Sequence, residues 1–228
     1  EVESSDEHVF PKWLQRRHNL WNEELQLLNG TTIRYRQLKV PCCRKCNNDH
    51  LGELENVIQS ATEDGYKTCE ELDDLTIFQW MAKLFFGILR KELSLLVDRS
   101  DPSKGTIVTE DVIESFNNLH GFLQSVRRPA EFFGLNPFSV LVANVHSIGD
   151  SQRYFFRDNL FLMVASLRTE GVGFIVSFED AEFSQSTYGR YLEEVDGRKL
   201  HPLQFDELYA KVVYQTYRMS GVPKFTTV

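Results

Sequence analysis

The chain has 228 residues, of which 42% are hydrophobic and 25% are charged, and its formal net charge is −8. This composition supports a packed core in one or two domains and excludes an intrinsically disordered chain. No apolar run reaches the ~18 residues needed to cross a bilayer, and no signal peptide is visible. We therefore expect a cytoplasmic protein that has no membrane partner.

The first sixty residues predict a helix, a β-hairpin and a second helix. Asn29-Gly30 is a strong hairpin signal, because a type I′ turn needs a positive φ at both of its central positions. We expect the hairpin strands over residues 24–28 and 31–40, with Pro41 ending the second strand. Apolar residues at helical spacing predict the two helices over residues 10–18 and 48–61.

The rest of the chain predicts helices first and strands later. A wide apolar stripe over residues 75–97, interrupted by Lys83, indicates a buried helix, and a second helix is expected over 112–126. Residues 138–145, 160–167 and 173–178 have strand character, and 202–219 predict a closing amphipathic helix. The predicted fold class is α+β, with a ββα module at 1–62, a helical bridge at 63–135 and an α+β domain with a small, mainly antiparallel sheet at 136–228.

Basic residues gather in one segment of this acidic chain. Residues 11–48 carry eight Lys and Arg against two Glu, whereas residues 49–228 carry 17 bases and 27 acids. Nucleic-acid backbones are bound by such local patches, although a solvated basic face gives the same pattern. The candidate nucleic-acid contacts are Lys12, Arg16, Arg17, Arg34, Arg36, Arg44 and Lys45.

Two short motifs contain residues suited to phosphodiester hydrolysis. Glu7-His8 precedes the first helix, and a neutral His can take a proton from water near neutral pH because its ordinary pKa is ~6.5. Cys43 and Cys46 form a CxxC pair that runs straight into Asn47, and three of the four cysteines lie within five positions. This clustering indicates a metal knuckle in a reducing compartment and not a disulfide framework.

The order of Glu7-His8, a hairpin, the CxxC pair with Asn47 and a helix resembles the HNH nuclease family, over about the first sixty residues. The core of that family is a β-hairpin and a helix around one metal ion. The resemblance implies a DNA endonuclease with His8 as the general base and with Glu7 and Asn47 as ligands of Mg²⁺ or Mn²⁺. The family more often has Asp where this chain has Glu7.

Several features of the family have no settled counterpart in this chain. The middle Asn of the HNH name is matched by either Asn29 or Gln37, and His50 is a further candidate contact to metal or substrate. Many members bind a structural Zn²⁺ with two CxxC pairs. No such pair precedes Glu7, so we expect zinc at Cys43 and Cys46 only if an upstream pair completes the site.

The resemblance also implies a role in restriction or phage defence beside a protein partner such as an ATPase. It leaves open whether the protein forms an oligomer and whether the substrate is DNA or RNA. One alternative is a non-catalytic zinc-knuckle module that binds nucleic acid or protein. Another is a structural or regulatory protein in which residues 63–228 carry the function.

Overall fold

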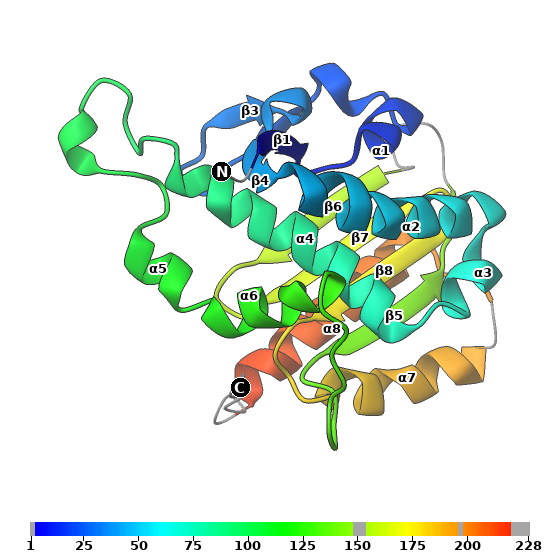
Figure 1. The fold of residues 1–228 in the computed structure, drawn as a ribbon. Helices are drawn as coiled ribbons and strands as arrows, with labels where there is room; N and C mark the ends of the chain where they lie inside the picture. The colour runs from blue at the N-terminus through cyan, green and yellow to red at the C-terminus, as the bar shows by residue number, and fades with distance from the viewer. Residues whose placement is uncertain (1–2, 148–153, 196–197, 220–228) are drawn as a thin grey trace. The chain divides into compact units, whose positions relative to one another are not determined.

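The computed structural model describes residues 3–147, 154–195 and 198–219, and it has an α+β fold, as the sequence predicts (Figure 1). The chain forms two compact units, which are described separately. The first unit contains Glu1–Asn56 and Ala82–Arg128, and the second contains Val57–Met81 and Pro129–Thr226. The segment 63–135, expected as a helical bridge, therefore contributes residues to both units.

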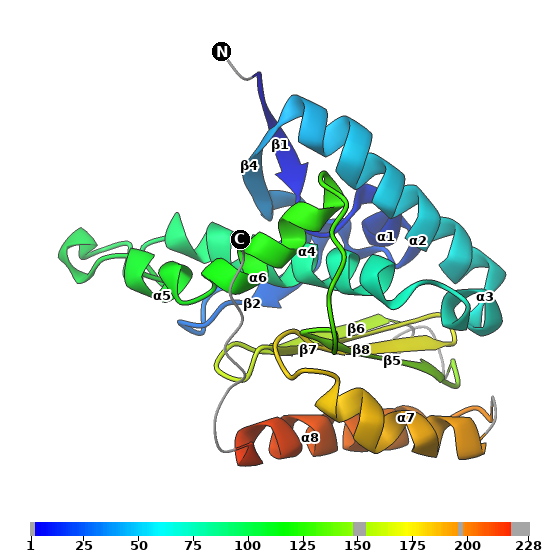
Figure 2. The same ribbon diagram turned by 60° about the horizontal axis from the view of Figure 1, so that its bottom comes forward.

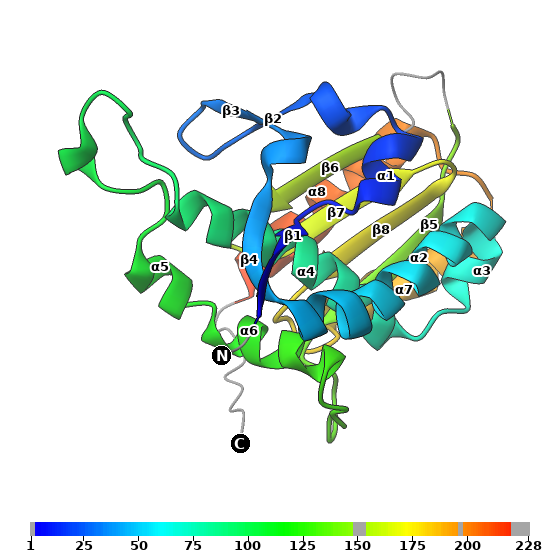
Figure 3. The same ribbon diagram turned by 45° about the horizontal axis from the view of Figure 1, so that its top comes forward.

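A pair of antiparallel strands forms the centre of the first unit. β1 (Ser4–His8) pairs with β4 (Lys39–Cys43), and Figure 3 shows the two strands side by side. The chain then enters a π-helix at Cys46–Leu51, which continues into α2 (Gly52–Asp64). The expectation that Pro41 ends the strand is wrong, because Pro41 lies within β4 opposite Asp6. A two-stranded sheet consists of edge strands, which tolerate proline.

The connection between β1 and β4 contains α1 (Lys12–Arg17) and the hairpin predicted around Asn29-Gly30. Gly30 has a φ of +79°, but Asn29 is not among the residues with a positive φ, so the loop between the paired Gln26 and Thr32 is not the expected type I′ turn. The hairpin strands, β2 (Glu24–Gln26) and β3 (Thr32–Arg34), are shorter than predicted. The chain leaves β3 through a 3₁₀ turn that buries both Tyr35 and Leu38, which are three residues apart and so share one side of the turn.

The helical part of the first unit comes from the second half of α4 (Asp74–Leu93), from α5 (Glu110–Glu114) and from α6 (Asn117–Leu123). The single helix predicted over residues 112–126 is interrupted at Phe116, whose backbone is not helical. This interruption places the buried Phe116 ring 5.9 Å from the ring of Phe85. Packing of this aromatic pair therefore overrides the helical periodicity.

The second unit is a four-stranded antiparallel sheet with the strand order β5-β8-β7-β6. The strands are β5 (Ser139–Asn144), β6 (Tyr154–Asn159), β7 (Val164–Thr169) and β8 (Val172–Ser177). Figure 2 shows α7 (Phe183–Val195) and α8 (Pro202–Arg218) on one face. The other face is covered by α3 (Tyr66–Glu70) and the first half of α4, where Trp80 contacts Phe174.

The sequence-based expectations for the second unit need two corrections. The strand expected over residues 160–167 begins only at Val164, because the backbone N–H of Leu162 donates to the Asn159 side chain at 3.0 Å and Met163 has a φ of +50°. These residues form a turn. Strand β6 and helix α7 were not predicted at all. Within the described ranges, no helix is both long and apolar enough to cross a membrane.

Candidate functional site

Glu7 and His8 are buried neighbours at the end of β1, with 9% and 7% of their surfaces exposed. Successive side chains of a strand point to opposite faces. Their contacts follow this rule, since Glu7 pairs with Lys83 of α4 whereas His8 contacts Gln15 of α1. The side chain of Glu7 therefore faces α4, and the side chain of His8 faces α1.

Gln15 holds the imidazole of His8 in place. Its Nε2 donates to the carbonyl oxygen of Phe10 at 2.7 Å and lies 3.4 Å from Nδ1 of His8. The bond to Phe10 fixes the orientation of the amide, so Nδ1 of His8 faces a donor and acts as the acceptor. The proton of the neutral ring is then on Nε2. The ring of Trp21 lies beside the imidazole, with the two centroids 5.9 Å apart and an angle of 34° between the planes.

The surroundings of His8 disfavour its charged form. Burial lowers the pKa of His8 to about 4, and the charges of Lys39, Lys12 and Lys83 act in the same direction. The imidazole is therefore neutral at pH 7, which is the form that a general base requires. The low pKa also makes it a weak base.

Lys83 is buried beside Glu7 and has an oxygen acceptor for each of its three protons. Its Nζ lies 2.5 Å from Oε1 of Glu7 and 3.0 Å from the carbonyl oxygen of His8, and it also pairs with Oε1 of Glu55. Burial would lower the pKa of Lys83, but the carboxylates of Glu55 and Glu7 raise it above its ordinary value. Lys83 is therefore an ammonium ion that holds both carboxylates.

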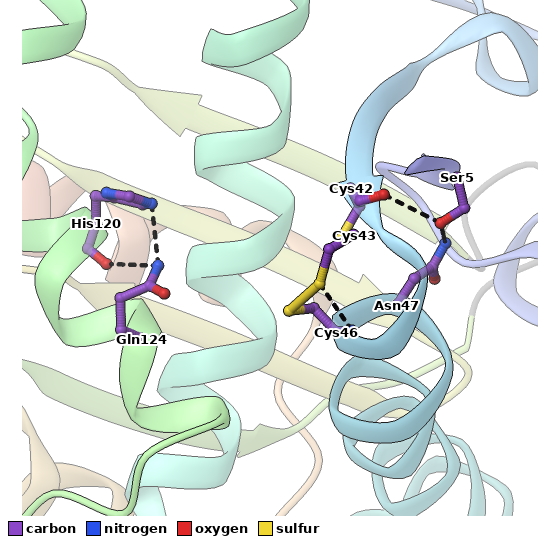
Figure 4. Close-up of a disulfide and its surroundings, with 7 residues drawn as sticks. All are labelled: Ser5, Cys42, Cys43, Cys46, Asn47, His120 and Gln124. Carbon is purple, nitrogen blue, oxygen red and sulfur yellow. Dashed lines mark hydrogen bonds between the residues drawn. A yellow bond between two sulfur atoms is a disulfide. The ribbon is translucent and has the colours of Figure 1, made fainter. Parts of the chain in front are cut away.

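The side chains of Glu7 and Asn47, the metal ligands that the resemblance implies, each have a partner within the chain. The Nδ2 atom of Asn47 donates to Oγ of Ser5 at 3.0 Å, as Figure 4 shows, while the carboxylate of Glu7 is bound by Lys83. Among the residues that the structure describes, no three His, Cys, Asp or Glu side chains are placed to hold a metal ion. The Mg²⁺ or Mn²⁺ site implied by the resemblance therefore does not fit these residues as they stand.

The sulfur atoms of Cys43 and Cys46 are joined in a disulfide across the turn between β4 and the π-helix (Figure 4). The backbone N–H of Cys46 donates to Sγ of Cys43 at 3.0 Å. A disulfide offers no thiolate ligands, so the expected structural zinc does not fit this state either. His50 lies one helical turn beyond Cys46 and is half-buried.

The seven candidate nucleic-acid contacts have different surroundings. Arg17 lies over the ring of Trp13 at 4.7 Å, Arg36 bonds to Asn22, and Arg44 pairs with Glu3 at 2.9 Å. The other four are exposed and have no ion-pair partner within the described part of the chain; these are Lys12, Arg16, Arg34 and Lys45. Lys39, which was not among the candidates, lies directly opposite His8 in the β1–β4 pair.

Sequence reasoning missed Gln15 and Lys83 as members of this site. The break that Lys83 makes in the apolar stripe of α4 was the visible signal for that residue, since a buried lysine needs carboxylate partners. Gln15 gave no comparable signal. Asn29, considered for the bracing role, stabilises its own turn, because its Oδ1 accepts from the backbone N–H of Thr31 at 3.1 Å. Gln37, the other choice, is exposed.

No family model, curated protein or solved structure matches this chain. The likeness to HNH nucleases therefore rests on the residues of the first unit and on their order along the chain.

Proposed function

We propose that the first unit is an HNH-like module that hydrolyses phosphodiester bonds of DNA, with His8 as the general base. The observation that supports this is the succession of β1, β4 and a helix, with His8 at the end of β1. Asn47, at the start of the helix, bonds back to Ser5 of β1. The paired strands that lead into this helix are β1 and β4, whereas the hairpin expected as the ββ part of the core, β2–β3, forms a separate sheet.

In the proposed reaction, His8 takes a proton from a water molecule as the water oxygen attacks phosphorus. The P–O bond to the leaving oxygen then breaks, and that oxygen takes up a proton from solvent. Lys12 and Lys39 lie near the imidazole and supply positive charge on the side where the phosphate would lie. No step is assigned to Mg²⁺ or Mn²⁺, because Lys83 holds the carboxylate of Glu7.

A second candidate function is a non-catalytic module that binds nucleic acid. The buried contact of Lys83 with Glu7 and Glu55 favours it, because this contact satisfies the carboxylate that a catalytic ion would need. Both candidate functions are compatible with a role in cytoplasmic restriction or phage defence beside a partner such as an ATPase. That role rests on the resemblance alone.

The test is nicking of supercoiled plasmid in the presence of Mg²⁺, Mn²⁺, Ni²⁺ or EDTA. His8→Ala should lower the rate by about 10²–10⁴-fold, which is the usual contribution of a general base. The matched control is His146→Ala, because His146 is exposed in the second unit. This variant should nick the plasmid at the wild-type rate. If His8→Ala nicks the plasmid at the wild-type rate, His8 is not the general base of the reaction. DNA binding without nicking under every condition supports the non-catalytic module.

A further inference from the structure

The first unit contains a cavity of about 700 Å³ that the proposed hydrolysis does not use. Its walls come from β1, β4, the π-helix, the second half of α4, α5 and α6. In Figure 4, the Cys43–Cys46 disulfide lies on one side, and His120 and Gln124 lie across from it. The volume falls in the range of about 300–1,000 Å³ that is typical of small-molecule sites.

The charges around this cavity favour an anion. Arg90 of α4 and Arg127, which follows α6, both line it, and neither has an ion-pair partner among the residues described. Glu7 is the single acidic residue in the described lining, and Lys83 already binds its carboxylate. Guanidinium groups without carboxylate partners match the planar, bidentate geometry of phosphate oxygens.

Next to the two arginines, the cavity has an aromatic surface. The ring of His120 is stacked on Phe86, with centroids 5.0 Å apart and an angle of 13° between the planes. The Nε2 atom of Gln124 lies 3.0 Å from Nε2 of His120, and an amide donor there requires an unprotonated ring nitrogen. Burial lowers the pKa of His120, as do Arg90 and Arg127, so the ring is neutral and close to both arginines.

Apolar side chains complete the wall; these include Val9, Leu93, Ile113, Leu123 and Val126. An inorganic anion would leave this apolar and aromatic surface exposed to water, so that its burial would add nothing to the binding. An uncharged aromatic molecule would leave the two arginines without a partner. The lining therefore suits a ligand that has both an anionic group and an aromatic ring.

We propose that this cavity binds a small aromatic phosphate ester of the size of a nucleoside monophosphate. Its phosphate lies between Arg90 and Arg127, and its ring lies against the stacked pair of Phe86 and His120. The proposal does not rest on the proposed hydrolysis, because none of these four residues belongs to the reaction assigned to His8. It gives the first unit a second site, for a small molecule.

The test is titration calorimetry of the full chain with three probes, which are AMP, adenosine and inorganic phosphate. AMP should bind at least tenfold more tightly than either of its two parts. Arg90→Gln and Arg127→Gln should each weaken AMP binding by roughly tenfold or more, since each removes a charge-assisted hydrogen bond. The same substitutions should leave adenosine binding unchanged. His120→Ala should weaken AMP and adenosine but not phosphate.

Two substitutions at neighbouring positions serve as matched controls. Lys91→Gln and Arg128→Gln remove the same charge next to each arginine but outside the cavity lining, and AMP affinity should stay at the wild-type value. Equal losses in the controls and in the cavity variants would overturn the proposal, as would AMP binding that is no tighter than phosphate binding. Circular dichroism checks that each variant is folded. His8→Ala should bind AMP with the wild-type affinity. The AMP proposal can therefore hold even if the nuclease proposal fails, and the two outcomes are measured separately.

Discussion

At the scale of single residues, the ammonium of Lys83 changes the chemistry expected beside His8. Two carboxylates and one carbonyl oxygen surround it, and these are the ligand types that a hard divalent cation prefers. Lys83 is 6% exposed, so little water reaches the pair that it forms with Glu7. The side chain therefore supplies, from within the chain, a positive charge that faces both carboxylates.

Replacing Lys83 should be among the most destabilising single changes in the first unit. Lys83→Met leaves the buried carboxylate of Glu7 and the partly buried carboxylate of Glu55 without a counter-charge, and breaking a buried ion pair in this way costs about 3–5 kcal/mol. Adding Glu7→Gln and Glu55→Gln should recover part of the lost free energy of unfolding, because the two carboxylates are then uncharged amides. Urea unfolding at pH 7 measures the free energy of unfolding of each variant.

The control for this experiment is Lys211→Met, because Lys211 forms an exposed ion pair with Glu207. Solvent screens exposed pairs, which therefore contribute little to stability, so this variant should unfold close to the wild type. If Lys83→Met is as stable as Lys211→Met, the buried ion pair of Lys83 does not stabilise the fold as argued.

The lowered pKa of His8 predicts a dependence of stability on pH. Burial, with Lys39, Lys12 and Lys83, lowers it from 6.5 to about 4, so between these two values the unfolded chain binds the proton more readily than the folded chain. The stability that depends on a neutral His8 is fully present above pH 6.5 and is lost as the pH falls to about 4. The loss is about 1.4 kcal/mol for each pH unit in that window.

Urea unfolding at pH 7 and at pH 5 tests this dependence on pH. The wild type should lose more stability between the two conditions than His8→Gln, which has no group to protonate. His146→Gln should behave like the wild type, because that histidine is exposed. Parallel losses in the wild type and in His8→Gln would show that His8 does not titrate in this way.

At the scale of elements, close packing of α8 on the sheet depends on a glycine in β8. A Cβ atom at Gly173 would lie 2.3 Å from Cε2 and 2.7 Å from Cζ of Phe205. Phe205 is buried and belongs to the core between α8 and the sheet, so its ring has little room to move. A side chain at position 173 must therefore push α8 away from β8 or distort the ring.

Gly173→Ala should lower the free energy of unfolding by about 1–3 kcal/mol, which is typical of an overpacked core. Combining it with Phe205→Leu should cost less than the two single changes added together, since the smaller side chain makes room for the methyl group. Thermal unfolding of the single and double variants measures this coupling.

Gly189→Ala in α7 is the matched control for the glycine experiment. Its Cβ would meet only Cγ of Gln185, at an ordinary 3.8 Å. Alanine is a better helix former than glycine, so this variant should gain about 0.5–1 kcal/mol. Equal effects of the two Gly→Ala changes would contradict the packing argument.

At the scale of the whole molecule, the sequence predicts the elements whose pattern is strong. The Asn29-Gly30 hairpin, the long helix α4 and the closing helix α8 were expected close to their observed positions, because turn chemistry or an apolar stripe marks each of them. Strand β6, at the edge of the sheet, was missed because three aromatic residues are followed by three polar ones, without the apolar–polar alternation of a half-buried strand. Helix α7 likewise carries few apolar residues.

The candidate site was less predictable than the fold, for a different reason. Strand alternation predicts that Glu7 and His8 point apart, and their contacts agree. Lys83 lies 75 residues beyond His8 in the chain, and no local pattern specifies such a contact. The choice between a disulfide and a zinc knuckle at Cys43 and Cys46 also depends on groups outside the motif itself.

The distribution of charge leads to the last prediction, which concerns DNA binding. The chain is acidic as a whole, with a net charge of −8, so any binding to DNA depends on where its bases lie. Lys39 is opposite His8 in the strand pair, and Lys12 is close enough to lower the pKa of His8. These two residues are therefore the phosphate contacts expected beside the candidate base.

The double variant Lys12→Gln, Lys39→Gln should bind a DNA duplex more weakly and with less dependence on salt. Each lost phosphate contact flattens the log–log salt slope by about 0.9, so the pair should remove about 1.8. Fluorescence anisotropy over a range of salt concentrations measures the slope. The loss should be alike for different duplex sequences, because phosphate contacts position the DNA without reading its bases.

The control for the salt experiment is Lys199→Gln, Lys211→Gln, which removes the same charge from exposed positions in the second unit. Both double variants lower the net charge of the chain by two, so any difference between them reflects location alone. The control should keep the wild-type slope, because its lysines are far in sequence from the basic segment and contact no phosphate in the proposal. Identical slopes in the two variants would show that the lysines beside His8 are a solvated surface, and the DNA proposal would then rest on the nicking experiment.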